Sequence, residues 1–311
     1  MAKFSTGHTV AIVLSVAALA GSLKLGGGFA ASLVIWLALN ILLAASFRFV
    51  QLIGELNFAI AGFVGIGAYA AGICTTMLGA PFALALGAAA VVAGVFGLIT
   101  AYITLRAKGP YFMLISFAFT EVVRLIYTQI PQIGGNSGMV GIFPPGWVSS
   151  FYPTLVIAVV IVLLVVLYRI EQSDFGRVLV AIRNNDAIVS AVGIDVHMTK
   201  VVCVGISSMV AGIIGGLLAH ANNVISPGDF SFLLAVYTLA FIKVGGESHI
   251  SGAIVGATVL TLLAQVALSF GPFEHIFYGA AIVLAVVLMP NGLIGLFDRL
   301  RGRTAAPVST H

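Results

Sequence analysis

The chain has 311 residues, of which 60% are hydrophobic and only 8% are charged, whereas a soluble globular domain carries about 25% charged residues. This composition excludes an ordinary soluble domain and predicts an all-α, polytopic membrane protein. The formal net charge of +4 does not indicate nucleic-acid binding, because no basic tract with interleaved aromatic residues occurs. We expect membrane lipid, and no nucleic acid, around the chain.

About ten segments are apolar and long enough to cross a bilayer, which takes roughly 17 to 25 residues each. They lie near residues 8–24, 29–47, 57–78, 82–105, 110–129, 152–170, 199–221, 230–246, 250–270 and 274–297. The first also has the features of a signal peptide, with Lys3 before the apolar run and a small-residue cleavage pattern at residues 18–20. A first membrane helix and a cleaved leader are therefore both open interpretations. The eighth segment is short and follows a Ser-Pro-Gly-Asp turn, so we expect it to be tilted or partly re-entrant.

Basic residues are distributed unequally between the two sides that ten crossings would create. Twelve of them fall at or near one side, namely Lys3, Arg48, Arg106, Lys108, Arg169, Arg177, Arg183, Lys200, Lys243, Arg299, Arg301 and Arg303, against Lys24 and Arg124 on the other. The positive-inside rule then predicts that both termini and residues 171–198 are cytoplasmic. Residues 129–151 become the largest external loop, whose glycine and proline turns predict little regular structure.

The cytoplasmic stretch 171–198 is the longest polar interruption of the chain, and its pattern predicts two short helices. Ser173 or Asp174 caps the first helix, which runs to about Ile182; residues 184–186 start the second, and Gly193 ends it. Each helix keeps an apolar pair at i,i+4 spacing, Val178/Ile182 and Ile188/Val192. A docking element for a cytoplasmic partner and an amphipathic pair on the lipid surface are both compatible with this pattern.

Sequence signals of catalysis are missing. No lysine follows a glycine, so the phosphate-binding loop of ATPases is absent, and no Gly-x-Ser-x-Gly elbow occurs. The six histidines never form close pairs, which gives no support to a metal site. Cys74 and Cys203 lie in apolar segments, where a disulfide is not expected. Gly65 and Gly67 fit close helix packing better than a dinucleotide site. We therefore expect neither enzymatic activity nor a cofactor.

Ionisable and amide side chains within the spans are the candidates for function, because charge in a membrane usually faces protein or water. Glu121 and Arg124, three residues apart, are expected to pair structurally. Glu55 and Lys243 lie near the predicted inner ends of spans, where they either snorkel to the interface, line an exit or pair across an inner gate. The candidate pathway residues Asn57, Asn222 and Asn223 either line a route for solute or tie helices together.

Several separated motifs, in order, resemble the longer membrane permease of bacterial branched-chain amino acid ABC importers, from about residue 50 onward. They are residues 56–59 (LNFA), 65–69 (GIGAY), 105–112 (LRAKGPYF), 119–121 (FTE), 134–142 (GGNSGMVGI), 181–185 (AIRNN), 191–194 (AVGI), 225–230 (ISPGDF), 244–246 (VGG), 252–257 (GAIVGA) and 290–295 (PNGLIG). Singly these motifs are weak, but their combination is specific.

The resemblance implies a fold of about ten transmembrane helices like that of the vitamin B12 and ribose importer permeases, in one permease domain over residues 1–311. It implies two ATP-binding cassette subunits, a second homologous permease and a periplasmic solute-binding protein as partners. Residues 171–198 would be the coupling helices on the ATPases, with candidate contacts at Arg177, Ile182, Arg183, Asn184, Asp186 and Gly193. The external residues Gly135, Asn136 and Ser137 are candidates for docking the binding protein. The implied location is the bacterial cytoplasmic membrane.

The sequence departs from the family pattern at three positions. The family usually has glutamine at position 55, where this chain has Glu55, and an apolar residue at position 243, where it has Lys243. At position 253 proline is commoner in the family than the alanine found here. These departures leave the solute open among branched-chain amino acids, urea, short amides and aromatic acids. A rival hypothesis is an ion-coupled secondary carrier with a relay through Glu55 and Lys243, although no inverted repeat of the kind such carriers often show is recognisable. A membrane receptor or scaffold that transports nothing is a third class.

Overall fold

The computed structural model describes residues 28–107, 109–149, 151–247, 249–268, 271, 274–288 and 292–293. Nine of the predicted spans coincide with helices in this part of the chain: α2 (Phe29–Gln51), α3 (Ile60–Thr76), α4 (Phe82–Thr104), α5 (Pro110–Gln129), α7 (Tyr152–Gln172), α10 (Val196–Asn222), α11 (Phe232–Gly245), α12 (Ile250–Ala267) and α13 (Glu274–Leu288). The predicted first span, with its signal-peptide alternative, lies outside the described residues. So do Lys3, Lys24, Lys108, Arg299, Arg301 and Arg303.

Six of the described helices are long and apolar enough to span a bilayer: α2, α4, α5, α7, α10 and α12. Helix α11 has only 14 residues, or roughly 21 Å at 1.5 Å per residue, which is less than the hydrocarbon thickness of about 30 Å. A 3-10 turn, η3 (Pro227–Phe230), precedes it and is closed by a capping box between Ser226 and Asp229. The eighth segment is thus as short as its sequence indicates, and its tilted or partly re-entrant path stays a prediction.

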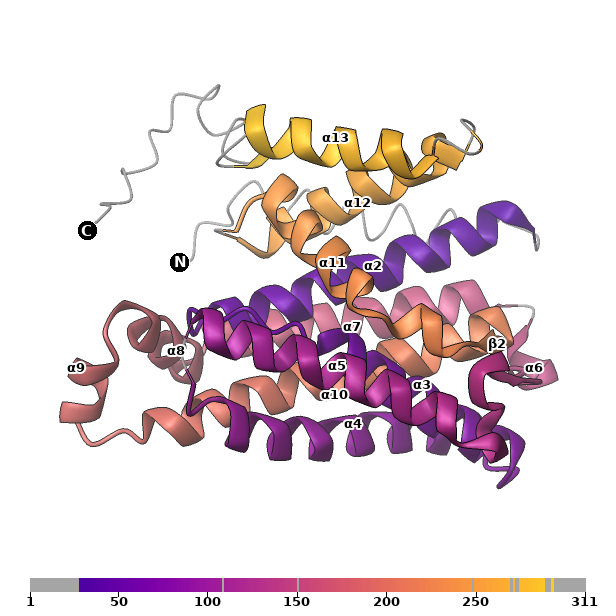
Figure 1. Cartoon of the computed structure of the whole chain (residues 1–311), viewed down its shortest axis with the longest axis horizontal. Coiled ribbons are helices and arrows are strands. Elements are labelled where there is room, and N and C mark those ends of the chain that lie inside the picture. The colour runs from indigo at the N-terminus through magenta and orange to yellow at the C-terminus, as the bar shows by residue number, and fades with distance from the viewer. Residues whose placement is uncertain are drawn as a thin grey trace.

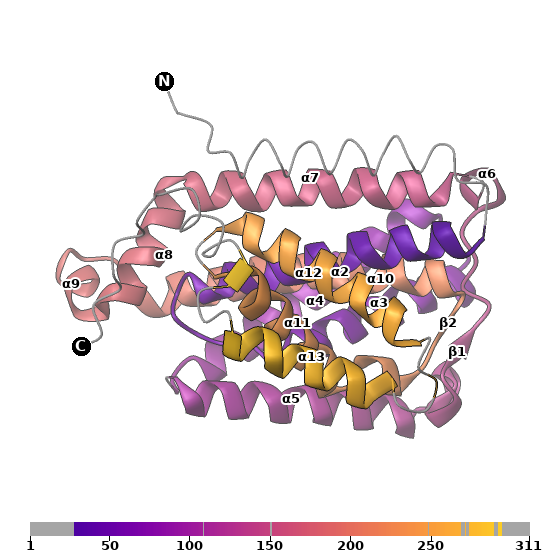
Figure 2. The same cartoon turned by 90° about the horizontal axis from the view of Figure 1, so that it is seen from above.

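Short elements gather at the two ends of the long helices (Figure 1). Helices α8 (Asp174–Asn184) and α9 (Asp186–Ala191) project at one end. At the opposite end lie the 3-10 turns η1 (Pro131–Ile133) and η2 (Gly135–Ser137), the strand β1 (Met139–Val140), the single-turn helix α6 (Gly146–Ser149) and the strand β2 (Val224–Ile225). The view from above shows the same separation, with α7 and α5 on opposite flanks (Figure 2).

Helix α10 forms the centre of the described bundle, where it packs against α3, α4 and α2. Glycines allow its backbone to approach its neighbours closely. A Cβ atom added to Gly67 of α3 would lie 2.2 Å from the carbonyl oxygen of Gly212, and one added to Gly215 would lie 1.9 Å from that of Val64. The contacts Gly67–Gly212, Ala71–Gly216 and Thr75–His220 run in the same order along both helices, so α3 and α10 are parallel. The packing interpretation of Gly67 is thereby confirmed.

Two further predictions about side chains are also confirmed. Cys74 and Cys203 are both free thiols. Arg124 Nε donates a hydrogen bond to Glu121 Oε2 at 2.8 Å on α5, and the other carboxylate oxygen of Glu121 accepts the backbone N–H of Phe232 at 3.3 Å. The Glu121–Arg124 pair therefore supports the start of α11 from α5.

Candidate functional site

The segment between α7 and α10 folds as two short helices, as its sequence predicts. The Asn185 side chain caps α9, because its Oδ1 accepts hydrogen bonds from the backbone N–H groups of Ala187 at 2.9 Å and Ile188 at 3.3 Å. Gly193 follows the end of α9 with φ of +88°, a left-handed conformation that terminates helices. Helix α8 continues to Asn184, two residues beyond the predicted end at Ile182.

Apolar side chains of α8 and α9 point in two directions. Leu179, Ile182 and Val189 are buried, so they hold the two helices against the rest of the chain. Ile182 consequently contributes no surface for a partner in this arrangement. Ile188 and Val192 are 64% and 76% exposed, respectively, and they form an apolar patch on α9. The predicted i,i+4 pair Ile188/Val192 is thus an outward pair, whereas Val178/Ile182 faces at least partly inward.

The other predicted coupling residues lie at or near the surface. Arg177, Arg183, Asn184 and Gly193 are exposed, and Asp186 is partly buried. Arg177 pairs with Asp174 one turn earlier on α8, and both side chains are more than three-quarters exposed. Such an exposed ion pair adds little stability, so the fold depends little on the charges of Arg177 and Asp174.

A buried ion pair fastens the end of α7 to α2. Arg48 is 3% exposed, and its two terminal nitrogens donate to the two carboxylate oxygens of Glu171 at 2.8 and 2.9 Å. Its Nε donates to the backbone carbonyl of Glu247 at 3.0 Å. A bidentate guanidinium–carboxylate pair is both strong and directional. The entry to α8 is therefore fixed to α2 and to the turn between α11 and α12.

A second buried cation, Lys200, lies in the first turns of α10. Its Nζ is 3.3 Å from Asp186 Oδ2 and 3.7 Å from Glu55 Oε1. Glu55 is only 5% exposed, so the snorkelling interpretation is wrong for this residue. Lys243 is about half exposed and pairs with Glu247 one turn later. Glu55 and Lys243 therefore have different ionic partners, and the predicted pair across an inner gate is not formed.

Residues 52–59, between α2 and α3, are non-helical but largely buried. Their backbone is satisfied from α5, because Phe58 N–H donates to Ser116 Oγ at 3.1 Å and Thr120 Oγ1 donates to the Phe58 carbonyl at 2.9 Å. Irregular backbone inside a membrane protein requires such partners. Asn57 is 2% exposed; its Oδ1 accepts the Ala59 N–H at 3.1 Å, and its buried Nδ2 has no hydrogen-bond partner in the described structure. This loop thus contains one unused amide donor.

The end opposite α8 carries the candidate docking loop for a binding protein. Asn136 and Ser137 are exposed, whereas Gly135 is buried. The loop is more regular than its turn-rich sequence predicts, because Met139 and Val140 of β1 pair antiparallel with Ile225 and Val224 of β2. The ladder depends on Gly138, which has φ of +80° and a backbone so close that an added Cβ would lie 2.0 Å from the Ile225 carbonyl oxygen.

Asn222 and Asn223 lie at this same end and are separated from Asn57. Asn223 has φ of +61° and terminates α10, and its carbonyl accepts the N–H groups of Gly141 at 3.1 Å and Ile142 at 3.2 Å. Asn223 therefore ties the external loop to α10, while Asn222 is exposed. Because α3 and α10 are parallel, the position of Asn57 before the start of α3 places it away from the end of α10. The three asparagines do not form one site.

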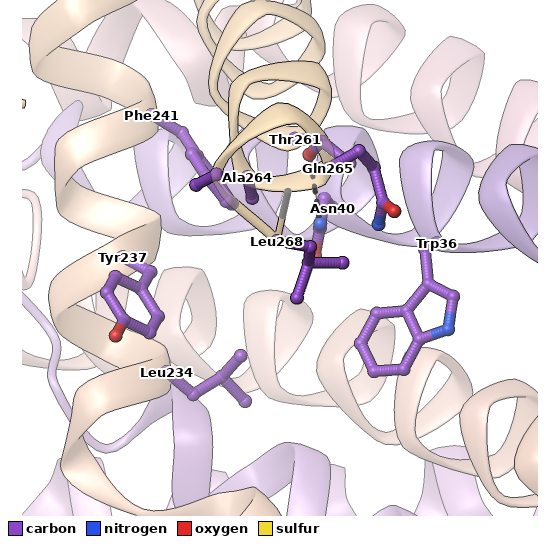
Figure 3. A pocket seen from close by; sticks show the side chains of 10 residues that line it. Trp36, Asn40, Leu234, Tyr237, Phe241, Thr261, Ala264, Gln265 and Leu268 are labelled. Atoms are coloured by element: carbon purple, nitrogen blue, oxygen red, sulfur yellow. Dashed lines mark hydrogen bonds between the residues drawn. The ribbon is translucent and has the colours of Figure 1, made fainter. Parts of the chain in front are cut away.

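A groove of about 280 Å³ lies between α2, α11 and α12. Figure 3 shows Asn40, Thr261 and Gln265 gathered on one side of it, with Trp36 and Tyr237 around the space. Asn40 Nδ2 donates to Thr261 Oγ1 at 3.0 Å, and the buried Gln265 Oε1 has no hydrogen-bond partner within the described part of the chain. The other lining residues are Leu234, Phe241, Ala264, Ala267 and Leu268. The groove combines an apolar wall with neutral polar groups.

From the sequence alone, Arg48 and Lys200 serve only as markers of topology. Their roles depend on contacts with Glu171, Glu55 and Asp186, which are 14 to 145 positions away in the chain. The sequence contains a weak signal, because Arg48 directly follows one apolar segment and Lys200 stands at the start of another, where an unpaired buried charge is costly. That signal indicates a buried partner without identifying it.

Comparison with known proteins gives consistent matches over most of the chain. The family profile described as "Branched-chain amino acid transport system / permease component" matches residues 29–287. The high-affinity branched-chain amino acid transport system permease protein LivM of Escherichia coli is 25% identical over 292 residues, covering 84% of this chain and 67% of LivM.

Two other similar proteins carry names other than LivM. A probable branched-chain amino acid transport permease protein LivH of Methanocaldococcus jannaschii is 27% identical, covering 77% of this chain and 83% of LivH. The ribose import permease protein RbsC of Escherichia coli is 24% identical, covering 82% of this chain and 83% of RbsC. No solved structure matches the chain significantly.

Proposed function

Because the chain belongs to the family of branched-chain amino acid transport system permease components, we propose that it forms the translocation pathway of an ABC importer for branched-chain amino acids. The observation that carries this proposal is the family match over residues 29–287, which includes every described helix from α2 to α12 and nearly all of α13. The names of the LivM and LivH relatives support the solute class. An importer of the same type for urea, short amides or aromatic acids is the alternative.

ATP hydrolysis takes place on two separate ATP-binding cassette subunits in this proposal, and the chain itself is not an enzyme. The missing Gly-Lys-Ser/Thr loop supports this division of labour. The ATPases dock on α8 and α9, where Ile188 and Val192 form an exposed apolar patch beside the exposed charges of Arg177 and Arg183. An apolar centre with a polar rim is the usual composition of a protein interface.

The α8–α9 end is cytoplasmic in this proposal, and the protein lies in the bacterial cytoplasmic membrane with both termini inside. The described basic residues support this orientation. Seven of them belong to helix ends or turns on the α8–α9 side, namely Arg48, Arg106, Arg169, Arg177, Arg183, Lys200 and Lys243, whereas Arg124 lies in the second half of α5, toward the β1–β2 end. The β1–β2 end is then external, and its exposed Asn136 and Ser137 are offered to a periplasmic binding protein.

Transport follows from alternating access of a pathway shared with a second homologous permease. Closure of the ATPases on ATP changes their contacts with α8 and α9, and this differential binding shifts the membrane helices between two states. A branched-chain amino acid is a zwitterion with an apolar side chain, so a pathway of apolar walls and neutral polar groups suits it. The unused Nδ2 donor of Asn57 is a group of this kind, and few charges are needed for rapid release.

The ion pairs of Glu55 and Lys243 do not support the relay that a secondary carrier would need. That hypothesis requires Glu55 and Lys243 to act together, but Glu55 pairs with Lys200, and Lys243 pairs with Glu247. Lys243 is also about half exposed, so its charge needs no functional explanation.

Uptake by reconstituted vesicles tests the proposed function. The complete complex of this chain, the second permease, the ATPases and the binding protein is expected to accumulate radiolabelled leucine only when ATP is present. Excess isoleucine or valine should block this uptake. Uptake by the isolated chain, driven by a proton gradient without ATP, would refute the importer. If the complex instead takes up a solute whose uptake is blocked by urea or aromatic acids but not by excess leucine, only the proposed solute class would be refuted.

A further inference from the structure

Three elements of the chain meet at the buried side chain of Lys200. The residue lies one turn into α10, and its side chain is 7% exposed. Its ammonium group contacts Asp186, the first residue of α9, at 3.3 Å and Glu55, in the loop between α2 and α3, at 3.7 Å. One cation therefore joins the predicted ATPase dock to a loop in the interior of the membrane domain.

Glu55 extends this connection to α5. Its second carboxylate oxygen accepts the backbone N–H of Gly109 at 3.1 Å, and Gly109 immediately precedes α5. The same loop touches α8 at a second point, because a Cβ atom added to Gly54 would lie 3.3 Å from Cγ of Arg183. If α8 and α9 move, they therefore act on the 52–59 loop at two neighbouring residues, Gly54 and Glu55.

The 52–59 loop is firmly attached to the membrane helices beyond it. Phe58 is hydrogen-bonded through both its N–H and its carbonyl to Ser116 and Thr120 of α5, and Asn57 immediately precedes it. Movement of Glu55 therefore reaches α3, α5 and the unused amide donor of Asn57 together.

Burial makes the ion pairs of Lys200 costly to break. Removing one partner from a buried ion pair leaves an uncompensated charge and is strongly unfavourable, whereas an exposed pair such as Arg177–Asp174 exchanges its partner for water at little cost. The Lys200 ammonium group cannot leave Asp186 or Glu55 without losing a charge partner in a nearly dry environment. Pulling on α9 should therefore move α10 and the loop with it.

We propose that Lys200 is a positioning residue that transmits the movement of α8 and α9, through Asp186 and Glu55, to the 52–59 loop and the start of α5. This inference rests on the proposed function, because it assigns a route by which ATP hydrolysis drives transport. A purely structural Lys200 would stabilise the fold without affecting how much solute moves for each ATP hydrolysed.

Asp186→Asn is the most informative single change. It removes the charge attraction between Lys200 and α9 and leaves at most a neutral hydrogen bond, but it keeps the Lys200–Glu55 pair, and Asp186 is partly exposed, so the fold should survive. In vesicles that contain the complete complex, the number of leucine molecules transported per ATP is expected to fall by about fivefold or more. The melting temperature should fall somewhat, because Lys200 loses one of its two charge partners, but the yield of co-purified ATPases should remain that of the wild type, because the Asp186 carboxylate contacts Lys200 and is mostly covered. Glu247→Gln is the matched control. It also converts a carboxylate at this end of the molecule to an amide, but it affects only the more exposed Lys243–Glu247 pair. The number of leucine molecules transported per ATP should therefore be unchanged in this variant.

A triple variant, Glu55→Gln with Asp186→Asn and Lys200→Met, separates positioning from stability. Removing all three charges together leaves none of these three groups charged without its partner, so the variant should fold, yet it should still transport few leucine molecules per ATP. A wild-type ratio in either Asp186→Asn or the triple variant would overturn the proposal, as would loss of the ATPases from Asp186→Asn. If the wild-type complex itself shows no ATP-driven leucine uptake, the proposed function fails instead.

Discussion

A close contact between α10 and α3 in the bundle centre gives a quantitative prediction. A Cβ atom at Gly215 would lie 1.9 Å from the Val64 carbonyl oxygen and 2.7 Å from the Ala68 nitrogen, whereas carbon–oxygen contacts between helices are comfortable at about 3.3 Å. Gly215→Ala therefore forces α10 and α3 apart locally by roughly 1.4 Å. Overpacking of this kind costs about 1–3 kcal/mol, and it falls at the upper end here because both obstructing atoms are backbone.

The substitution also gains about 1 kcal/mol, because alanine favours helix more than glycine does. We expect a net loss of about 2 kcal/mol and a fall in melting temperature of roughly 5 °C. Gly87→Ala on α4 is the matched control, because nothing lies within 4 Å of its added Cβ; it should keep or raise the melting temperature.

A thiol-reactive dye measures this difference directly. Cys203 is fully buried in α10, so its labelling on heating reports the opening of the bundle, and a Cys74→Ser background removes the other described thiol. Gly215→Ala that melts at or above the temperature of Gly87→Ala would show that α3 and α10 do not approach as closely as described.

Three further predictions concern the α8–α9 end. Arg48→Met leaves the Glu171 carboxylate, whose side chain is 16% exposed, without its guanidinium partner, so it should destabilise the chain by up to about 3 kcal/mol; recovery of folded protein at wild-type yield from detergent extracts would contradict this. Gly193→Val imposes a β-branched side chain on φ of +88°, at a cost of roughly 1 kcal/mol or more, and Arg183→Glu reverses an exposed charge. Both should lower the yield of ATPases in pull-downs without unfolding the membrane helices, and full retention of the ATPases with both changes present would count against this surface as the dock. Lys243→Leu removes only an exposed ion pair, so uptake and stability should change little; a several-fold change in uptake would restore a functional role for this lysine.

The sequence predicts the spans well because apolar length is a local property. Nine helices of the described residues lie where runs of apolar residues place them, and the Asn185 cap and Gly193 stop follow from the local chemistry of helix ends. The division into α8 and α9 needs no information from elsewhere in the chain, although Ser173, which the sequence predicts as a cap of α8, makes no side-chain capping hydrogen bond and donates to the Ile170 carbonyl.

Long-range contacts account for what the sequence does not predict. The β1–β2 ladder joins residues about 85 positions apart, so turn-rich local sequence gives no sign of it. The i,i+4 pair of Val178 and Ile182 specifies a stripe but not whether that stripe faces a partner or the chain itself. Glu55 and Lys243 both lie near inner ends of predicted spans, which makes their pairing one possibility, yet the three-dimensional structure places Lys200, 145 positions from Glu55 in the chain, beside it.

Photo-cross-linking from α9 tests most directly whether this face docks the ATP-hydrolysing subunits. A photoreactive amino acid replaces Val192, which is 76% exposed, or, as the control, Val140 of β1, which is 66% exposed at the opposite end. In membranes that contain the complete complex, the probe at Val192 is expected to form an adduct with an ATPase subunit, and the probe at Val140 should form none with it. An ATPase adduct from Val140, or none from Val192 while the ATPases stay bound, would contradict both the dock and the orientation.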